Sequence, residues 1–187
     1  MNKNLKLKEY RSIGKFYNEI IESSAFEKIF QTLKFVGKQK RNIFFCGNGG
    51  SAANANHASV DLNNIHRKGG SIKFQSISLC SNTPMITAIA NDFGFEKIFT
   101  LQLEDLGKKG DVLFVFSVSG LSKNVLDAAK YCKKKGIKVI SIAGFNGSKI
   151  KRIANISISI NSKNYGMVED LQMNIIHSLC EKFKFKI

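Results

Sequence analysis

The sequence predicts an α/β protein in which a mostly parallel sheet carries helices on both faces. Short apolar runs, typical of buried strands, alternate along the chain with longer segments of helical period. Two loops of small residues, 47–51 and 117–120, each follow an apolar run directly and precede a helix. No linker, repeat or low-complexity stretch divides the 187 residues. We therefore expect one domain spanning residues 1–187.

Two helices are expected before the first strand. Apolar residues recur at helical spacing over residues 4–22, and Ser24 and Glu27 form a capping-box pattern at the start of a second helix that continues to Val36. Residues 1–37 would then form an N-terminal helical extension. The sequence leaves open whether this extension packs on its own domain or on a neighbouring subunit.

The remaining elements are expected to alternate. The predicted strands are residues 42–46, 71–79, 111–116, 137–142 and 154–160, and the predicted helices are residues 52–62, 83–90, 95–106, 122–136 and 168–183. Thr83 is the expected N-cap of one helix, because Pro84 fits the first helical position after it. Ser122 is the expected N-cap of another helix.

The chain carries 29 basic and 14 acidic residues, a formal charge of +15. This charge is compatible with nucleic-acid binding, but only four of the basic residues are arginines, the residue type that such proteins favour for base and phosphate contacts. A solvated, Lys-rich surface is the favoured interpretation. No apolar run approaches the ~18–20 residues of a membrane span. We expect neither nucleic acid nor a membrane as a partner.

The four cysteines and the N-terminus indicate the cellular compartment in which the protein is expected. Cys46, Cys80, Cys132 and Cys180 lie far apart and form no CxxC pair, which argues against a zinc knuckle or a redox motif. The N-terminus is basic and lacks the apolar stretch of a signal peptide. We expect a cytoplasmic protein with buried, reduced thiols.

The two small-residue loops are candidates for binding an anion. Both follow strands, and ligands of parallel sheets bind beyond the carboxyl ends of the strands. Residues 47–51 read Gly-Asn-Gly-Gly-Ser and offer backbone N–H groups at a helix N-terminus, although they form neither a Walker loop nor a dinucleotide motif. Ser117, Ser119 and Ser122 surround Gly120 in the second loop. Either loop alone fits a tight turn equally well, but two of them favour a phosphorylated ligand.

Histidines and carboxylates form a second candidate group. His57 and Asp61 are four residues apart on a predicted helix and share one face, as metal ligands, an acid–base pair or a simple surface contact would. His177 and Glu169 lie on the predicted terminal helix. His66 has no partner visible in the sequence and is expected at the surface.

The motifs resemble those of a known family. The string Cys-Gly-Asn-Gly-Gly-Ser-Ala-Ala-Asn-Ala-Asn-His at residues 46–57 resembles the opening motif of SIS (sugar isomerase) domains, and more narrowly that of phosphoheptose isomerases. Residues 88–95, residues 110–122 and the terminal helix with His177 agree in order and spacing. The resemblance implies a three-layer αβα sandwich (the SIS fold) and homotetramers with active sites between subunits. It also implies conversion of sedoheptulose 7-phosphate to D-glycero-D-manno-heptose 7-phosphate.

The resemblance also implies roles for single residues. It assigns substrate contacts to Asn48, Gly49, Gly50, Ser51, Asp61, Asn91, Asp92, Ser117, Val118, Ser119, Ser122 and Glu169. It assigns zinc, as a candidate cofactor, to His57, Asp61, Glu169 and His177. Aldose–ketose isomerisation needs a base and an acid, for which we expect Asp61 and His177 respectively. A zinc ion would polarise the carbonyl group.

Some positions depart from the family pattern. The family has Glu at the position of Asp61, Gln at that of Glu169 and Thr at that of Val118. Glu169 and His177 are also eight residues apart, which is about 12 Å along a helix, so both reach one ion only if they lean together. Two alternatives remain at this point: a non-catalytic SIS protein that binds the bacterial replication initiator, and a sugar-phosphate sensor. Retention of His57 and His177 argues against the former.

Overall fold

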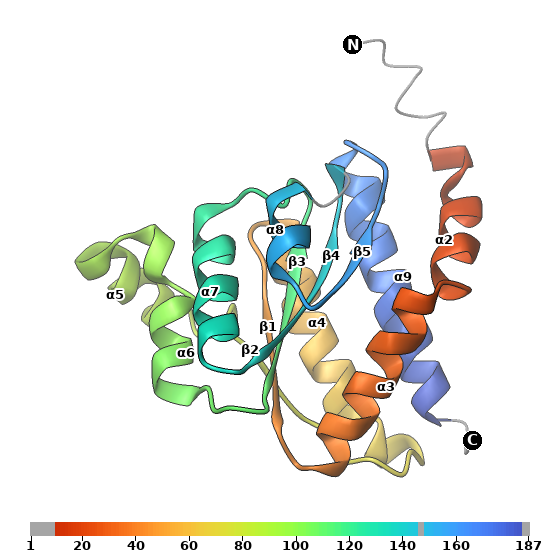
Figure 1. Cartoon of the computed structure of the whole chain (residues 1–187), viewed down its shortest axis with the longest axis horizontal. Helices are drawn as coiled ribbons and strands as arrows, with labels where there is room; N and C mark the ends of the chain where they lie inside the picture. Colours follow the sequence, from red (N-terminus) through yellow and green to blue (C-terminus); the bar gives the residue numbers. More distant parts are fainter. Residues whose placement is uncertain (1–9, 146–147, 185–187) are drawn as a thin grey trace.

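The computed structural model describes residues 10–145 and 148–184. Its centre is one five-stranded sheet in the order β2-β1-β3-β4-β5, with every pair of neighbouring strands parallel (Figure 1). The strands are β1 (Asn42–Cys46), β2 (Gln75–Ser78), β3 (Val112–Ser117), β4 (Lys138–Ala143) and β5 (Ile156–Ser159). The prediction of a parallel sheet is confirmed.

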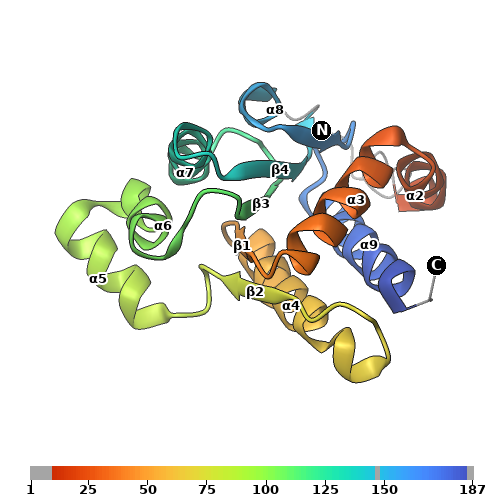
Figure 2. The same cartoon turned by 60° about the horizontal axis from the view of Figure 1, so that its bottom comes forward.

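Helices cover both faces of this sheet (Figure 2). One face carries α2 (Ile13–Ile21), α3 (Ser24–Lys38), α4 (Gly50–Asn64) and α9 (Tyr165–Lys184). The other carries α5 (Thr83–Phe93), α6 (Thr100–Leu106), α7 (Lys123–Lys134) and α8 (Ser148–Ile153). Short 3₁₀ turns follow α4 (His66–Lys68) and α5 (Phe95–Lys97). The expected αβα sandwich of three layers is therefore confirmed.

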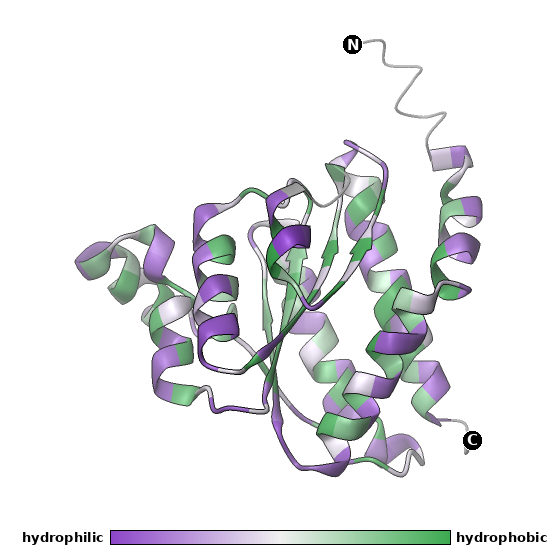
Figure 3. Ribbon diagram, in the orientation of Figure 1, coloured by the Kyte–Doolittle hydropathy of each residue, from purple (hydrophilic) through white to green (hydrophobic). Residues whose placement is uncertain are grey.

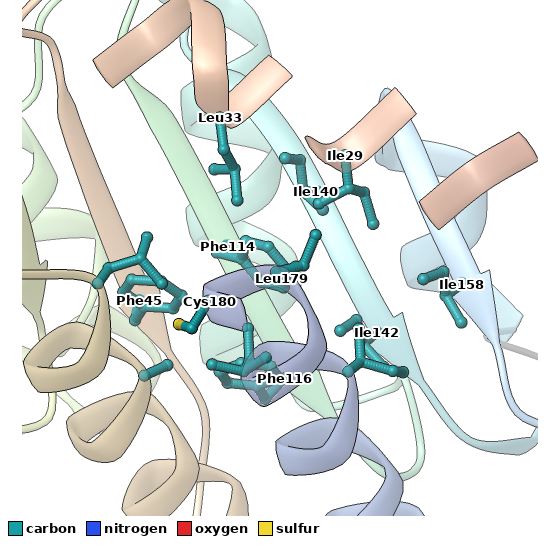
Figure 4. Packing of buried hydrophobic residues seen from close by; sticks show 14 of the residues in the cluster. Ile29, Leu33, Phe45, Phe114, Phe116, Ile140, Ile142, Ile158, Leu179 and Cys180 are labelled. Atoms are coloured by element: carbon teal, nitrogen blue, oxygen red, sulfur yellow. The ribbon is translucent and has the colours of Figure 1, made fainter. Parts of the chain in front are cut away.

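Alternation of side chains along the strands creates two separate cores. In β1, Ile43 and Phe45 enter the core under α3, α4 and α9, whereas Phe44 enters the core under α5 to α8. Strands buried on both faces must be apolar throughout, and the hydropathy colouring of Figure 3 shows the central strands in green. Figure 4 shows Phe45, Phe114 and Phe116 side by side in the first core, where the rings of Phe45 and Phe114 stack at 5.3 Å.

The two N-terminal helices pack on their own domain. α3 contributes Ile29 and Leu33 to the first core, and α2 lies along α9, where the Tyr17 hydroxyl is 2.6 Å from Ser178 Oγ. The part of the predicted first helix before residue 10 lies outside the described residues. The N-cap of α3 is Ser23 rather than Ser24, because the Ser23 hydroxyl accepts the Phe26 N–H at 3.2 Å.

The structure corrects two other predictions and adds one helix. Asn82, not Thr83, caps α5, since the Asn82 carboxamide accepts the Met85 N–H at 3.1 Å. The single helix expected over residues 95–106 is a 3₁₀ turn followed by α6, an arrangement in which the adjacent side chains of Ile98 and Phe99 are both buried. α8 was not predicted. It has six residues and is too short for helical periodicity to be visible in the sequence.

The outer strands are shorter than the sequence indicated, because only residues 75–78 and 156–159 pair with a neighbouring strand. Within the part of the chain that the structure describes, no helix is both long and apolar enough to cross a membrane.

Candidate functional site

A pocket of about 290 Å³ lies beyond the carboxyl ends of β1 and β3. The two strands pair in parallel, with Cys46 opposite Val115, so the loops that follow them meet at one edge of the sheet. The pocket is lined by both loops and by the start of α9: Asn48, Gly49, Gly50, Ser51, Ser117, Val118, Ser119, Ser122, Tyr165 and Glu169. The structure thus brings together the two loops that the sequence singled out.

The glycine loop needs a backbone conformation that other residues rarely adopt. Gly49 has φ 57° and ψ −126°, a combination that is strained for any residue with a Cβ. This turn lets α4 begin at Gly50, shortly after β1 ends at Cys46, and both Gly50 and Ser51 line the pocket. Backbone donors at a helix N-terminus favour an anionic group.

A reciprocal pair of amides joins the two loops. Asn48 Nδ2 donates to Asn124 Oδ1 at 2.9 Å, and Asn124 Nδ2 donates back to Asn48 Oδ1 at 2.8 Å. Asn124 is 2% exposed and lies in the first turn of α7. Asn124 is not among the residues predicted from the sequence, because its burial at the start of a helix is visible only in the structure. The pair fixes the glycine loop relative to α7.

Hydroxyl groups surround the second loop. Ser117 Oγ accepts the Gly120 N–H at 3.0 Å, and Ser119 Oγ accepts the Leu121 N–H at 3.2 Å. Ser122 is the N-cap residue of α7, as predicted, although its side chain makes no capping hydrogen bond. The buried Val118 adds an apolar contact to the same wall. This end of the pocket offers uncharged donors and no lining carboxylate among the described residues.

α9 supplies the opposite wall. Tyr165 and Glu169 are one helical turn apart and both line the pocket, although only Glu169 was predicted from the sequence. The i, i+4 spacing from Glu169 was a signal that could have identified Tyr165. Burial, and to a lesser extent the neighbouring Asp170, raise the pKa of Glu169, while a hydrogen bond from the Ser51 N–H acts in the opposite direction.

A buried polar network fixes α9 against α4. Asn54 Nδ2 donates to the backbone oxygen of Glu169 at 2.9 Å and to Gln172 Oε1 at 3.0 Å. Gln172 is fully buried and donates to the Ile142 oxygen of β4 at 3.3 Å. The network therefore sets the position of Glu169 in the pocket.

The second candidate group is assembled between α4 and α9, farther along both helices. The Asp61 Oδ2 atom lies 3.3 Å from His57 Nε2 and 3.4 Å from His177 Nε2. Both imidazoles are half-exposed, whereas the Asp61 side chain is 23% exposed. This three-residue cluster opens into its own pocket of about 230 Å³, which is also lined by Lys68, Cys180, Glu181 and Lys184.

The donor atoms of the cluster fit a zinc ion. One ligand atom from each of His57, Asp61 and His177 can be chosen so that all lie within 4.8 Å of one another. Two imidazole nitrogens and a carboxylate oxygen are a common ligand set of catalytic zinc sites, which keep a further position open. Glu169 lies outside this group and lines the first pocket instead. The predicted four-ligand set is therefore not assembled within one chain, because two helical turns of α9 separate Glu169 from His177.

Three predicted positions lie elsewhere. Asn91 and Asp92 are exposed on α5, where Asn91 Nδ2 donates to Asp92 Oδ1 at 2.7 Å, and neither side chain lines the two pockets. Their contact with substrate stays a prediction. His66 has a partner after all, since its Nδ1 atom lies 3.0 Å from the Asn63 backbone oxygen.

Comparison with known proteins identifies the family. The family model described as SIS domain matches residues 10–144. The chain is 40% identical over 156 residues to the phosphoheptose isomerase of Helicobacter pylori (strain Shi470), covering 82% of this chain and 77% of that protein. It is 37% identical over 174 residues to the phosphoheptose isomerase of a Nitratiruptor species, covering 87% and 92% of the two chains.

Solved structures of phosphoheptose isomerases have the same fold as this chain. The phosphoheptose isomerase of Neisseria gonorrhoeae superposes with a TM-score of 0.86 at 26% identity and covers 95% of this chain and 94% of its own. A phosphoheptose isomerase from Francisella tularensis gives a TM-score of 0.85 at 26% identity, with full coverage of both chains. Matching motifs, fold and relatives together show that this chain belongs to the SIS domain family and, within it, to the phosphoheptose isomerases, enzymes that isomerise sugar phosphates.

Proposed function

We propose that the chain converts sedoheptulose 7-phosphate to D-glycero-D-manno-heptose 7-phosphate. The observation that carries the proposal is the pairing, on the same two helices, of a pocket that offers uncharged phosphate donors with a carboxylate flanked by two imidazoles. The non-catalytic alternatives find no support, because the relatives that match most of the chain are named isomerases.

In this proposal the serine loop binds the phosphate group. Ser117, Ser119 and Ser122, together with the N-terminus of α7, provide hydroxyl and backbone donors of the kind that a phosphate accepts. The glycine loop, from Asn48 to Ser51, contacts the sugar. Binding energy from the phosphate, which takes no part in the reaction, orients the reacting carbons.

Asp61 and His177 are the proposed acid–base pair. Asp61 takes a proton from C1 of the ketose while His177 donates a proton to the carbonyl oxygen at C2, which gives an enediol. Return of the carbon-bound proton to C2 and loss of the proton from the C1 hydroxyl give the aldose. Zinc would be the alternative use of this cluster: held by His57, Asp61 and His177, it would supply polarisation of the carbonyl group in place of the proton from His177.

We further propose a homotetramer in which the phosphate pocket of one subunit and the three-residue cluster of another subunit together form one active site. In one chain the three-residue cluster and the phosphate pocket are separate cavities. Met85, Phe93 and Phe95 expose 42%, 63% and 56% of their surface on α5 and the turn that follows it. Apolar side chains clustered in this way favour protein association, and α5 also carries Asn91 and Asp92. The expected cytoplasmic location stays a prediction.

Conversion in heavy water tests the reaction. The wild-type chain, incubated with sedoheptulose 7-phosphate in D₂O, should give an aldose 7-phosphate with deuterium at C2, detected by NMR, because the proton that Asp61 takes from C1 exchanges with solvent before a proton is returned to C2. Tight binding of sedoheptulose 7-phosphate without product or exchange would contradict the proposed isomerisation and indicate a sensing role.

A further inference from the structure

We propose that Glu169 is a specificity-determining residue, whose carboxylate at the N-terminus of α4 restricts the pocket to sugar phosphates with an uncharged end opposite the phosphate. The inference rests on the proposed function, since it defines the ligand class of the same pocket. It concerns the charge of the ligand rather than the reaction.

The carboxylate lies directly over the first residue of α4. The carboxylate is so close to Gly50 that a Cβ atom at this position would overlap the Glu169 carboxyl group. The Ser51 N–H donates a hydrogen bond to the same carboxylate. The partial positive charge of this helix end is therefore already matched by an anion that belongs to the chain.

Glu169 is held in this position by its surroundings. Its backbone oxygen accepts the Asn54 amide, and the buried Gln172 on the next turn accepts both the Asn54 amide and the Ser51 hydroxyl, the latter at 3.3 Å. These bonds join α9 to the start of α4 and fix the backbone from which the Glu169 side chain projects.

The pocket therefore combines one carboxylate with uncharged donors. Glu169 is the one carboxylate among the described lining residues, and the serine loop carries uncharged donors. In the proposed binding mode the serine loop holds the phosphate. A second anionic group at the far end of the ligand would face Glu169 in a partly desolvated site, where like charges repel strongly.

Two six-carbon ligands test this inference. D-Glucitol 6-phosphate and 6-phospho-D-gluconate share their phosphate and carbon chain and differ at C1, which is a hydroxymethyl group in one and a carboxylate in the other. Calorimetric titration at neutral pH should show that the wild-type chain binds D-glucitol 6-phosphate at least about tenfold more tightly. In Glu169→Gln, an isosteric change, the ratio should fall to about twofold, mainly because 6-phospho-D-gluconate binds better.

Asp170→Asn is the matched control. It removes one negative charge from the neighbouring residue, which is exposed and does not line the pocket, so the wild-type preference should persist.

Equal binding of the two ligands by the wild type, or a preference unchanged in Glu169→Gln, would overturn the inference. Failure of the wild type to bind either ligand would overturn both this inference and the phosphate pocket. A preference that depends on Glu169, without conversion of sedoheptulose 7-phosphate, would contradict only the proposed reaction.

Discussion

The phosphate pocket and the His57–Asp61–His177 cluster lie on the same two helices, α4 and α9, but are built from different parts of the chain. The pocket uses backbone groups and short side chains where strands end and helices begin. The cluster uses side chains that project from the middle of both helices, with two of its three members half-exposed. The positions of the backbone donors follow from the order of strands and helices. The geometry of the cluster instead depends on the rotation of α4 and α9 about their axes and on the length of the side chains.

This difference predicts that a change in the cluster affects the reaction step and a change in the pocket affects binding. Asp61→Asn gives the largest expected effect: a kcat lower by about 10²-fold or more with a KM close to wild type, because the base is lost while the phosphate contacts remain. Steady-state kinetics with sedoheptulose 7-phosphate provide the measurement. Glu181→Gln, in the same cavity but outside the cluster, is the control. A rise in KM alone would show that the two regions are not separate.

Zinc should stabilise the protein through the cluster and not through the pocket. At a free zinc concentration 100 times its Kd, binding adds about 2.7 kcal/mol to the free energy of unfolding, so a chelator should lower Tm and zinc should restore it. His177→Ala should abolish this shift, because one of three ligand atoms is lost. His66→Ala, which removes a histidine outside the cluster, should keep it. A zinc-dependent shift that survives in His177→Ala would place the metal elsewhere.

Gly49→Ala perturbs the pocket alone. The substituted residue must adopt φ 57° with ψ −126°, which costs about 1–3 kcal/mol, or the loop must move. Denaturant unfolding should show a loss in this range, and KM should rise while zinc binding stays unchanged. Gly14→Ala is the control, since a Cβ there meets nothing within 4 Å. Wild-type KM in Gly49→Ala would mean that the loop conformation does not matter for binding.

The smallest expected effect is the contribution of Glu169 to the pH dependence of the stability of the folded chain. Burial raises its pKa, so the folded chain keeps this proton to a higher pH than the unfolded chain, and the stability contributed by the group falls as the pH rises above the unfolded pKa. Glu169→Gln should therefore be more stable than wild type at neutral pH, by less than about 1 kcal/mol, and lose this advantage in acid. Thermal unfolding between pH 4 and 8 (about the range in which carboxyl groups titrate) provides the comparison. An advantage that grows in acid would contradict the assigned pKa direction.

Sequence reasoning succeeded where periodicity and topology decide the outcome. The alternation of apolar runs and helices predicted the parallel sheet, and the loops after β1 and β3 had to meet because parallel neighbours end at the same edge. It failed where the outcome depends on contacts between distant elements. Glu169 and His177 share a helix, yet the distance along α9 assigns them to different cavities. Asn124 acquires its importance only from Asn48, 76 positions away.

The Asn48–Asn124 pair also has a consequence for chemical ageing. An asparagine followed by glycine is prone to deamidation, because its side-chain carbonyl is readily attacked by the next backbone nitrogen. Both amide atoms of Asn48 are engaged by Asn124, which restricts the rotation that this attack requires. Conversion of Asn48 to Asp would remove the amide donor and set two oxygens against each other. The contact that joins the two loops therefore also protects Asn48, and with it the pocket, from deamidation.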